Sequence, residues 1–365
     1  MKTGIVISAI VLGVCLCTAF VARYGPHPHI TRVNFPQPAG WPQPHYNFKA
    51  NPLSQEGIAL GRRLFYDGRL SKDGNFPCAS CHQQFAAFTN YDHNLSHGFN
   101  NTLTTRNAPG LFNLAWQQEF MQDGGINHLD LQPLAPLTAP NEMAEDIDSV
   151  LMKLRADKPY RRMFKAAFGD TAINTQRMTK ALSQFMLMMV SADSKYDQVM
   201  QGKAQFNLPE RLGYGIFQQK CITCHPPPLF TDFSYRNIGM EDDPYNHDMG
   251  RMKITGKRED SLKFRVPSLR NVMVTAPYGH DGRFFSLIEI FEHYRKRVKQ
   301  MPNTDSLLRK GIPLSNFEIG QLTAFLYTLT DSTFITDKRF DVPDNMLVSQ
   351  AADAADHPLP AKKKL

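Results

Sequence analysis

The sequence predicts a mainly α-helical protein made of two related units with long loops. Three observations predict this class. Apolar residues recur at helical spacing over residues 175–200, 286–299 and 315–329. A short residue pattern occurs once in each half of the chain. The alternation of apolar and polar residues that is typical of strands is rare, whereas 23 glycines and 25 prolines interrupt the chain.

The composition is that of a folded protein. A chain of 365 residues is long enough for two domains, and 42% hydrophobic and 21% charged residues are ordinary values. These values exclude a disordered chain, a fibrous repeat and a protein with many membrane spans. The formal net charge is +7, but lysines and arginines are scattered, so we expect no nucleic-acid partner.

The N-terminal residues 1–23 contain an apolar run, residues 5–22, between Lys2 and Arg23. As a helix this run would be about 27 Å long, slightly less than the ~30 Å hydrocarbon core of a bilayer. It therefore predicts either a cleaved signal peptide or a single membrane anchor. Both alternatives imply that the rest of the chain is exported.

The two ends of the exported part have biased compositions. Residues 24–52 contain seven prolines and are predicted to form an extended linker. Residues 336–365 end in a polar, lysine-tipped stretch and are predicted to form a C-terminal tail.

The pattern that occurs twice is an amphipathic segment followed by Cys-x-x-Cys-His. Leu-Gly-x-x-(Leu/Ile)-Phe begins at Leu60 and again at Leu212, and the cysteine motif follows at 78–82 and at 221–225. The repeat predicts one domain over residues 53–200 and a second over residues 201–335.

The two Cys-x-x-Cys-His motifs are typical of covalent c-type haem attachment. Two thiols add to the porphyrin vinyl groups, and the adjacent imidazole binds the iron. A single motif could instead be half of a zinc site or a redox dithiol. Two copies in an exported chain favour haem, because the other two cysteines lie in the apolar N-terminal run. The predicted haem-binding residues are Cys78, Cys81, His82, Cys221, Cys224 and His225.

Several longer blocks resemble the bacterial di-haem cytochrome c peroxidase family, which includes MauG. They are LGRRLFYDGRLSKDGNFPCASCH, TRNAPGLFNLAW, PNEMAE and FRVPSLRNVMVTAPYGHDGRF. The resemblance runs from about Leu53 to Thr330. It implies two cytochrome c-like haem domains packed together, the first peroxidatic and the second used for electron transfer.

The resemblance also implies a distal pocket at the first haem. Gln132, Pro136 and Glu142 match the family's glutamine, proline and glutamate. A carboxylate there can move a proton between the two peroxide oxygens, and an amide can hold the peroxide. The alternative for Glu142 is a helix-capping role near Ala144. His97 resembles a loop histidine that binds the first iron in some members; His93 is a weaker candidate, and a surface role is the alternative.

At the second haem, the family places a methionine or a tyrosine opposite the proximal histidine. The matching position is Tyr294, with His293 as its rival and an ordinary helical core position as the alternative. His280 lies in the second-domain signature and is expected to form a hydrogen bond near this haem. Where the family usually has a tryptophan between its haems, this chain has Gln122.

The resemblance further implies a calcium ion between the domains. The matching positions are occupied by Asn107, Thr275 and Pro277, and calcium accepts amide and carbonyl oxygens. Turn and packing roles are the alternatives for these residues.

Three functions follow as hypotheses. The first is a periplasmic peroxidase that reduces hydrogen peroxide with electrons from a small cytochrome c, a cupredoxin or quinol. The second is a MauG-like enzyme that oxidises a protein substrate. The third is a non-catalytic electron carrier, against which a distal acid argues. In the family, such peroxidases are often homodimers.

Overall fold

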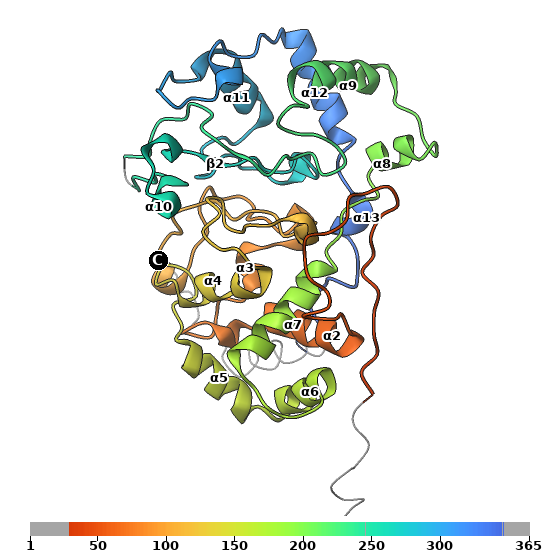
Figure 1. Cartoon of the computed structure of the whole chain (residues 1–365), viewed down its shortest axis with the longest axis vertical. Helices are drawn as coiled ribbons and strands as arrows, with labels where there is room; N and C mark the ends of the chain where they lie inside the picture. The colour runs from red at the N-terminus through yellow and green to blue at the C-terminus, as the bar shows by residue number, and fades with distance from the viewer. Residues whose placement is uncertain (1–28, 245, 345, 347–365) are drawn as a thin grey trace, which may run out of the picture.

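The computed structural model describes residues 29–244, 246–344 and 346, and its two helical units are stacked along the long axis of the molecule (Figure 1). The first unit contains α2 (Gln55–Phe65), α3 (Cys78–Cys81), α4 (Leu134–Thr138), α5 (Ile147–Ala156), α6 (Lys158–Phe168) and α7 (Thr175–Leu187). The second contains α8 (Lys195–Met200), α9 (Leu208–Lys220), α10 (Met252–Thr255), α11 (Leu287–Glu292) and α12 (Asn316–Tyr327). Helix α13 (Ser332–Ile335) returns to the first unit.

Strands contribute little to the described residues. A two-stranded antiparallel sheet pairs β1 (Tyr235–Arg236) with β2 (Phe264–Arg265). The remaining helical turns are a π-helical turn at His293–Arg297 and short 3₁₀ turns at Gly68–Leu70, Gln84–Ala86, Phe99–Asn101, Leu114–Trp116, Leu129–Leu131, Arg258–Asp260, Val272–Val274 and Ser306–Leu308. The prediction of a mainly α-helical fold with long loops is confirmed.

The repeated Leu-Gly pattern marks the same helix crossing in both units. A Cβ atom added to Gly61 of α2 would lie 1.9 Å from the Ala181 carbonyl oxygen of α7. A Cβ atom added to Gly213 of α9 would lie 1.9 Å from the Gln321 carbonyl oxygen of α12. Only glycine allows the helices to approach this closely, so the pattern is a packing motif.

Each unit has its own aromatic core. In the first unit, Phe65 of α2 packs edge-on against Phe185 of α7, with ring centroids 5.4 Å apart. In the second, Phe217 of α9 packs against Phe325 of α12 at 5.0 Å. The equivalent positions of these pairs support the interpretation of a duplication.

The helical stripe over residues 175–200 is interrupted between α7 and α8. The backbone N–H of Asp193 and the hydroxyl of Ser191 donate to the carboxylate of Asp331, while Ser194 caps α8. These side-chain hydrogen bonds replace the helical ones and turn the chain from the first unit into the second.

The proline-rich segment packs on the body from Ile30 onward instead of forming a free linker. Residues 30–48 form the dark red segment of Figure 1. The indole N–H of Trp116 donates to the Pro42 carbonyl at 2.7 Å, and the ring of Trp41 lies 4.9 Å from that of Trp116. The prolines set the extended backbone, and the aromatic residues between them supply the contacts with the first core.

Part of the predicted C-terminal tail also belongs to the first core. Phe340 is 2% exposed, and its carbonyl accepts a hydrogen bond from the Tyr66 hydroxyl at 2.6 Å. Residues 347–365, with the lysine-rich end, lie outside the described residues.

A fully buried ion pair joins α8 to the loop of the second domain. The Arg270 guanidinium donates two hydrogen bonds to the Asp197 carboxylate, at 2.7 and 2.8 Å, and lies over the ring of Trp41. Burial alone would raise the pKa of Asp197, but the hydrogen bonds and charge of Arg270 outweigh burial and lower it.

We expect Asp197→Asn to reduce the free energy of unfolding by about 3–5 kcal/mol, because it leaves a buried guanidinium without its counter-charge. Chemical denaturation measures the change. The matched control is Asp170→Asn, which breaks an exposed pair with Arg177 and should leave the unfolding midpoint unchanged. Equal effects of the two substitutions would contradict the prediction.

No helix among the described residues is long and apolar enough to cross a membrane. The apolar run at residues 5–22, predicted as a signal peptide or anchor, lies outside those residues.

Candidate active site

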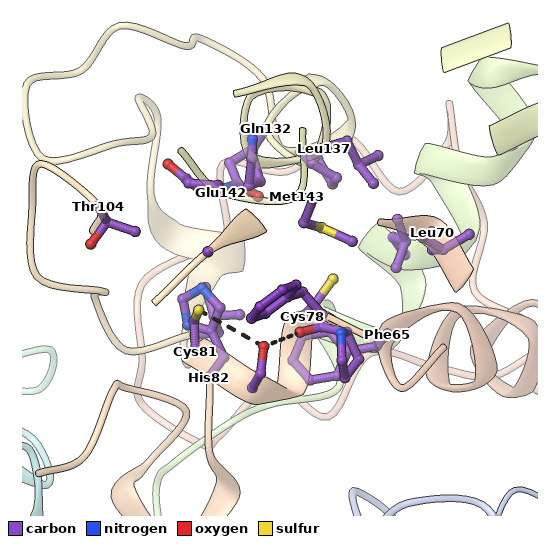
Figure 2. A pocket seen from close by; sticks show the side chains of 18 of the residues that line it. Phe65, Leu70, Cys78, Cys81, His82, Thr104, Gln132, Leu137, Glu142 and Met143 are labelled. Carbon is purple, nitrogen blue, oxygen red and sulfur yellow. Dashed lines mark hydrogen bonds between the residues drawn. The ribbon is translucent and has the colours of Figure 1, made fainter. Parts of the chain in front are cut away.

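The first cysteine motif forms one wall of a cavity in the first unit. Cys78 and Cys81 are the ends of α3, and His82 follows directly. Figure 2 shows Cys81 and His82 on one side of the cavity and Gln132 and Glu142 on the opposite side. Pro136 and His97 also line it, so the structure brings together all the residues predicted for the first haem site.

Both predicted proximal histidines are oriented in the same way. Nδ1 of His82 lies 2.7 Å from the Phe88 carbonyl oxygen, and Nδ1 of His225 lies 3.1 Å from that of Phe230. A carbonyl can only accept, so each Nδ1 carries the proton and each Nε2 is left for a metal. Burial lowers the pKa of both imidazoles, which favours the neutral form that binds iron.

The carboxyl group of Glu142 lies in the cavity without a hydrogen-bond or ion-pair partner among the described residues. Burial raises its pKa above the ordinary value for a glutamate. The alternative role in helix capping does not apply: Asp146 caps α5 by accepting from the N–H groups of Asp148 and Ser149. A carboxyl group that can hold or release a proton therefore lies across the cavity from His82 (Figure 2).

A short helix and turn fix the distance between the distal residues. Pro136 lies in α4, and its carbonyl accepts from the Met143 N–H at 3.1 Å. The Glu142 N–H donates to the Ala139 carbonyl at 3.0 Å. The Gln132 amide lies just before α4 and contacts the Met121 sulfur at 3.9 Å. The backbone therefore holds this constellation on one rigid turn.

The loop that carries His97 is clamped against the Glu142 turn. The Phe99 N–H donates to the Glu142 carbonyl at 2.7 Å. Although the His97 side chain is exposed, it also lines the cavity, and its ring contacts that of His93 at 5.2 Å. His97 thus lies at the cavity edge, and His93 is not among its described lining residues.

Gly98 was not singled out from the sequence, yet it sets this close approach. A Cβ atom there would lie 2.2 Å from the Asn141 carbonyl oxygen and 2.8 Å from the Cα atom of Glu142.

Gly98→Ala should displace the turn and slow the reaction with peroxide by roughly tenfold or more, since small misplacements of reacting groups are costly. Stopped-flow absorbance measures the rate. Gly215→Ala in α9 is the control because no atom lies within 4 Å of the added carbon, and an equal loss in both variants would contradict the prediction.

The second cysteine motif opens into a larger cavity of about 580 Å³, which first-unit residues such as Pro109 and Gln122 also line. Cys221, Cys224 and His225 line it together with Tyr294 and His280. The first cavity is narrower, about 70 Å³. Its lining includes Leu182 and the two methionines Met143 and Met186. The thioether side chains of the methionines change conformation at low cost.

The side chains of Tyr294 and of His293, the alternative iron ligand, lie in different surroundings. Tyr294 lines the second cavity, and burial raises the pKa of its phenol well above the ordinary value. His293 is 4% exposed, and its Nε2 lies 2.9 Å from the Ile238 carbonyl oxygen. Both residues are in the π-helical turn, a local distortion that often occurs at functional positions. The geometry favours Tyr294.

The residues predicted for calcium lie where the two units meet. The Asn107 amide N–H donates to the Pro277 carbonyl at 2.6 Å, and the Asn107 Oδ1 is buried without a hydrogen-bond partner. Thr275 also lines the second cavity, and its hydroxyl donates to the Val272 carbonyl. The free Oδ1 is the kind of oxygen that calcium binds.

Gln122 and His280 take part in the same junction. The Gln122 amide donates to the Asn107 carbonyl at 2.6 Å and more weakly to the His280 carbonyl at 3.5 Å. The His280 ring stacks on Phe264, with centroids 3.7 Å apart. The side chain of Gln122 thus bonds strongly within the first unit and weakly across the junction, where the Arg265 N–H also donates to the Gln122 carbonyl at 2.8 Å.

The donor sets fit two c-type haems and a calcium ion. Each motif presents two unpaired thiols and one oriented imidazole beside a cavity, and no disulfide uses these cysteines. Burial raises the pKa of Cys78 and of Cys221 to about 12, opposite to the lowered values of reactive redox dithiols.

Comparison with known proteins defines the class. The family model for di-haem cytochrome c peroxidases matches residues 55–205. The methylamine utilization protein MauG of Methylorubrum extorquens is 34% identical over 304 residues, which are 82% of this chain and 84% of that protein. The cytochrome c551 peroxidase of Nitrosomonas europaea is 33% identical over 76% of this chain and 81% of its own.

A solved structure agrees with this assignment. A MauG-like protein associated with microbial copper homeostasis superposes with a TM-score of 0.79 at 33% identity, covering 85% of this chain and 99% of that chain. The chain therefore belongs to the di-haem cytochrome c peroxidase and MauG family. It is an oxidoreductase with two haems, and the predicted family and cytochrome c-like fold are confirmed.

Proposed function

We propose that the protein is a periplasmic peroxidase that reduces hydrogen peroxide to water with electrons passed through the second haem. The observation that carries this proposal is the unpaired, partly buried Glu142 carboxyl group, which lies across the first cavity from His82 (Figure 2). An electron carrier does not need such a group. Reduction of one peroxide consumes two electrons and two protons and releases two waters.

The chain supplies proton transfer and orientation at the first haem. A carboxylate at Glu142 accepts a proton from one peroxide oxygen and returns it to the other, so that water leaves in place of hydroxide. The Gln132 amide orients the peroxide by hydrogen bonding. When bound through Cys78, Cys81 and His82, the haem supplies the redox chemistry that these side chains lack.

At the second haem, we propose attachment through Cys221 and Cys224, with His225 and Tyr294 as iron ligands. His280 supports this site through its stack with Phe264. A phenolate ligand favours ferric and higher states, because it stabilises positive charge on the metal.

We propose a calcium ion at Asn107, Thr275 and Pro277, supported by the unpartnered Asn107 Oδ1.

Chelation of the holoenzyme should remove about one calcium per chain and lower the unfolding midpoint temperature, because the ion joins two units. Elemental analysis and calorimetry measure both. Asn107→Ala should have the same low midpoint with or without chelator, whereas a chelator effect equal to that in wild type would exclude this site.

A second candidate is a MauG-like enzyme that oxidises a protein side chain. The position of Tyr294 in the second cavity favours it, because a tyrosine ligand would let the second haem share oxidising equivalents. The replacement of the family's tryptophan by Gln122 argues against it.

The test is a reaction of the purified holoenzyme with a many-fold excess of hydrogen peroxide in the presence of a reduced donor. A peroxidase oxidises two one-electron donors per peroxide over many turnovers. A modifying enzyme instead accumulates an oxidised form that reacts poorly with donors. If neither occurs, and spectra show both irons six-coordinate in every redox state, the protein is an electron carrier.

A further inference from the structure

Large apolar side chains are exposed where the second cavity opens to the surface. Leu307 is 52% exposed and also lines the cavity, so the cavity reaches solvent there. Ile288 of α11 is 62% exposed, while its neighbours Leu287 and Ile290 line the same cavity. Phe285, just before α11, is 61% exposed. Apolar side chains that gather at an opening are typical of surfaces that another molecule covers.

Two segments form one continuous edge of this opening. The Ile312 N–H donates to the Tyr294 carbonyl at 2.8 Å, and the Arg295 guanidinium donates to the Leu314 carbonyl at 3.1 Å. A Cβ atom on Gly311 would lie 3.0 Å from the carbonyl oxygens of Tyr294 and Arg295. The loop 306–314 therefore packs directly on the π-helical turn that ends α11.

This edge carries unpaired positive charge. Four exposed cations have no carboxylate partner among the described residues: Lys296, Arg297, Arg309 and Lys310. Nearby carboxylates are already engaged, in the pairs Glu292–Arg295, Asp305–Arg236 and Glu318–Lys220 and in the Glu289 capping box. We call these four cations, with Phe285, Ile288 and Leu307, the mouth surface.

We propose that the mouth surface docks a small acidic redox protein, which delivers electrons to the second haem. This inference rests on the proposed peroxidase function and narrows its donor. Apolar residues beside charged residues are the usual composition of protein interfaces, and unpaired cations steer an oppositely charged partner. Quinol is uncharged, so these four lysine and arginine side chains would not attract it electrostatically.

The test measures binding to the holoenzyme apart from turnover, with reduced plastocyanin as the acidic probe. Titration calorimetry and stopped-flow association are run at low and at high ionic strength. The double variant Lys296→Glu/Lys310→Glu should lower the association rate constant at least tenfold at low ionic strength and abolish its salt dependence. Leu307→Ser should speed dissociation without changing the salt dependence.

The matched control is Lys158→Glu/Lys165→Glu on α6. It makes the same change in net charge at the opposite end of the molecule (Figure 1) and should bind plastocyanin as wild type does.

Equal losses in the two double variants would overturn the proposal. So would faster association with basic mitochondrial cytochrome c than with plastocyanin, or binding of anionic vesicles that depends on Lys296 and Lys310. Turnover of wild-type enzyme with peroxide and a small uncharged reductant tests the peroxidase function separately. If that turnover is absent, the proposed function fails whatever the docking results.

Discussion

Replacing Glu142 with glutamine is expected to slow the reaction with hydrogen peroxide by roughly 10²–10⁴-fold, the range usual for the loss of an acid–base group. Glutamine preserves size and polarity but cannot carry a proton between two oxygens. The cavity should keep its shape, because the turn around Glu142 is held by backbone hydrogen bonds to Ala139 and Phe99. Stopped-flow absorbance at a single turnover measures the rate.

Asp148→Asn is the control for this substitution. It removes a carboxylate from the exposed surface of α5, only six positions further along the chain. Its reaction rate should equal that of wild type. A loss of less than about threefold in Glu142→Gln would mean that the carboxyl group takes no part in the proton transfer.

Proton transfer by Glu142 also sets the expected pH dependence. Its raised pKa means that the carboxylate, the form that accepts a proton, is lost at a higher pH than for an ordinary glutamate. The peroxide rate should therefore fall as the pH drops through this raised pKa, and the fall should be absent in Glu142→Gln.

Tyr294→Phe is expected to change the second haem more than any other single substitution outside the cysteine motifs. Loss of a phenolate ligand should raise the reduction potential of one haem by of the order of 100 mV, within the ~0.8 V that axial ligands span. It should also change the ferric EPR signal of that haem and leave the other signal as it was. Spectroelectrochemistry and EPR of the holoenzyme measure both.

Tyr278→Phe provides the matched comparison. Tyr278 lines the same cavity, but its hydroxyl donates to the Val272 carbonyl at 2.8 Å. Its removal should leave the potentials and both EPR signals in place. If Tyr294→Phe behaves in the same way as Tyr278→Phe, Tyr294 is not an iron ligand.

The sequence could predict the elements that depend on short-range patterns. The Leu-Gly pattern at Leu60 and Leu212 predicted a duplicated unit, and the structure shows a close helix crossing at each copy, where only glycine permits the contact. Likewise, the cysteine motifs have a fixed spacing, and both motifs lie beside cavities.

Contacts between distant residues could not be predicted in this way. The prolines of residues 24–52 indicate extended backbone, but the contact of Trp41 with Trp116 depends on side chains 75 positions apart. Phe340 looked like part of a polar tail because its burial requires α2 and α7, which are far away in the sequence. Gly98 was missed because its neighbour Asn141 is brought near only by folding.

Intact-protein mass spectrometry of the mature chain tests the central claim most directly. Covalent attachment at Cys78 and Cys81, and at Cys221 and Cys224, predicts a mass equal to the polypeptide plus two haem groups, retained after denaturation in acid. Cys221→Ser/Cys224→Ser should lose one of the two. A denatured wild-type chain that carries no haem would contradict the account.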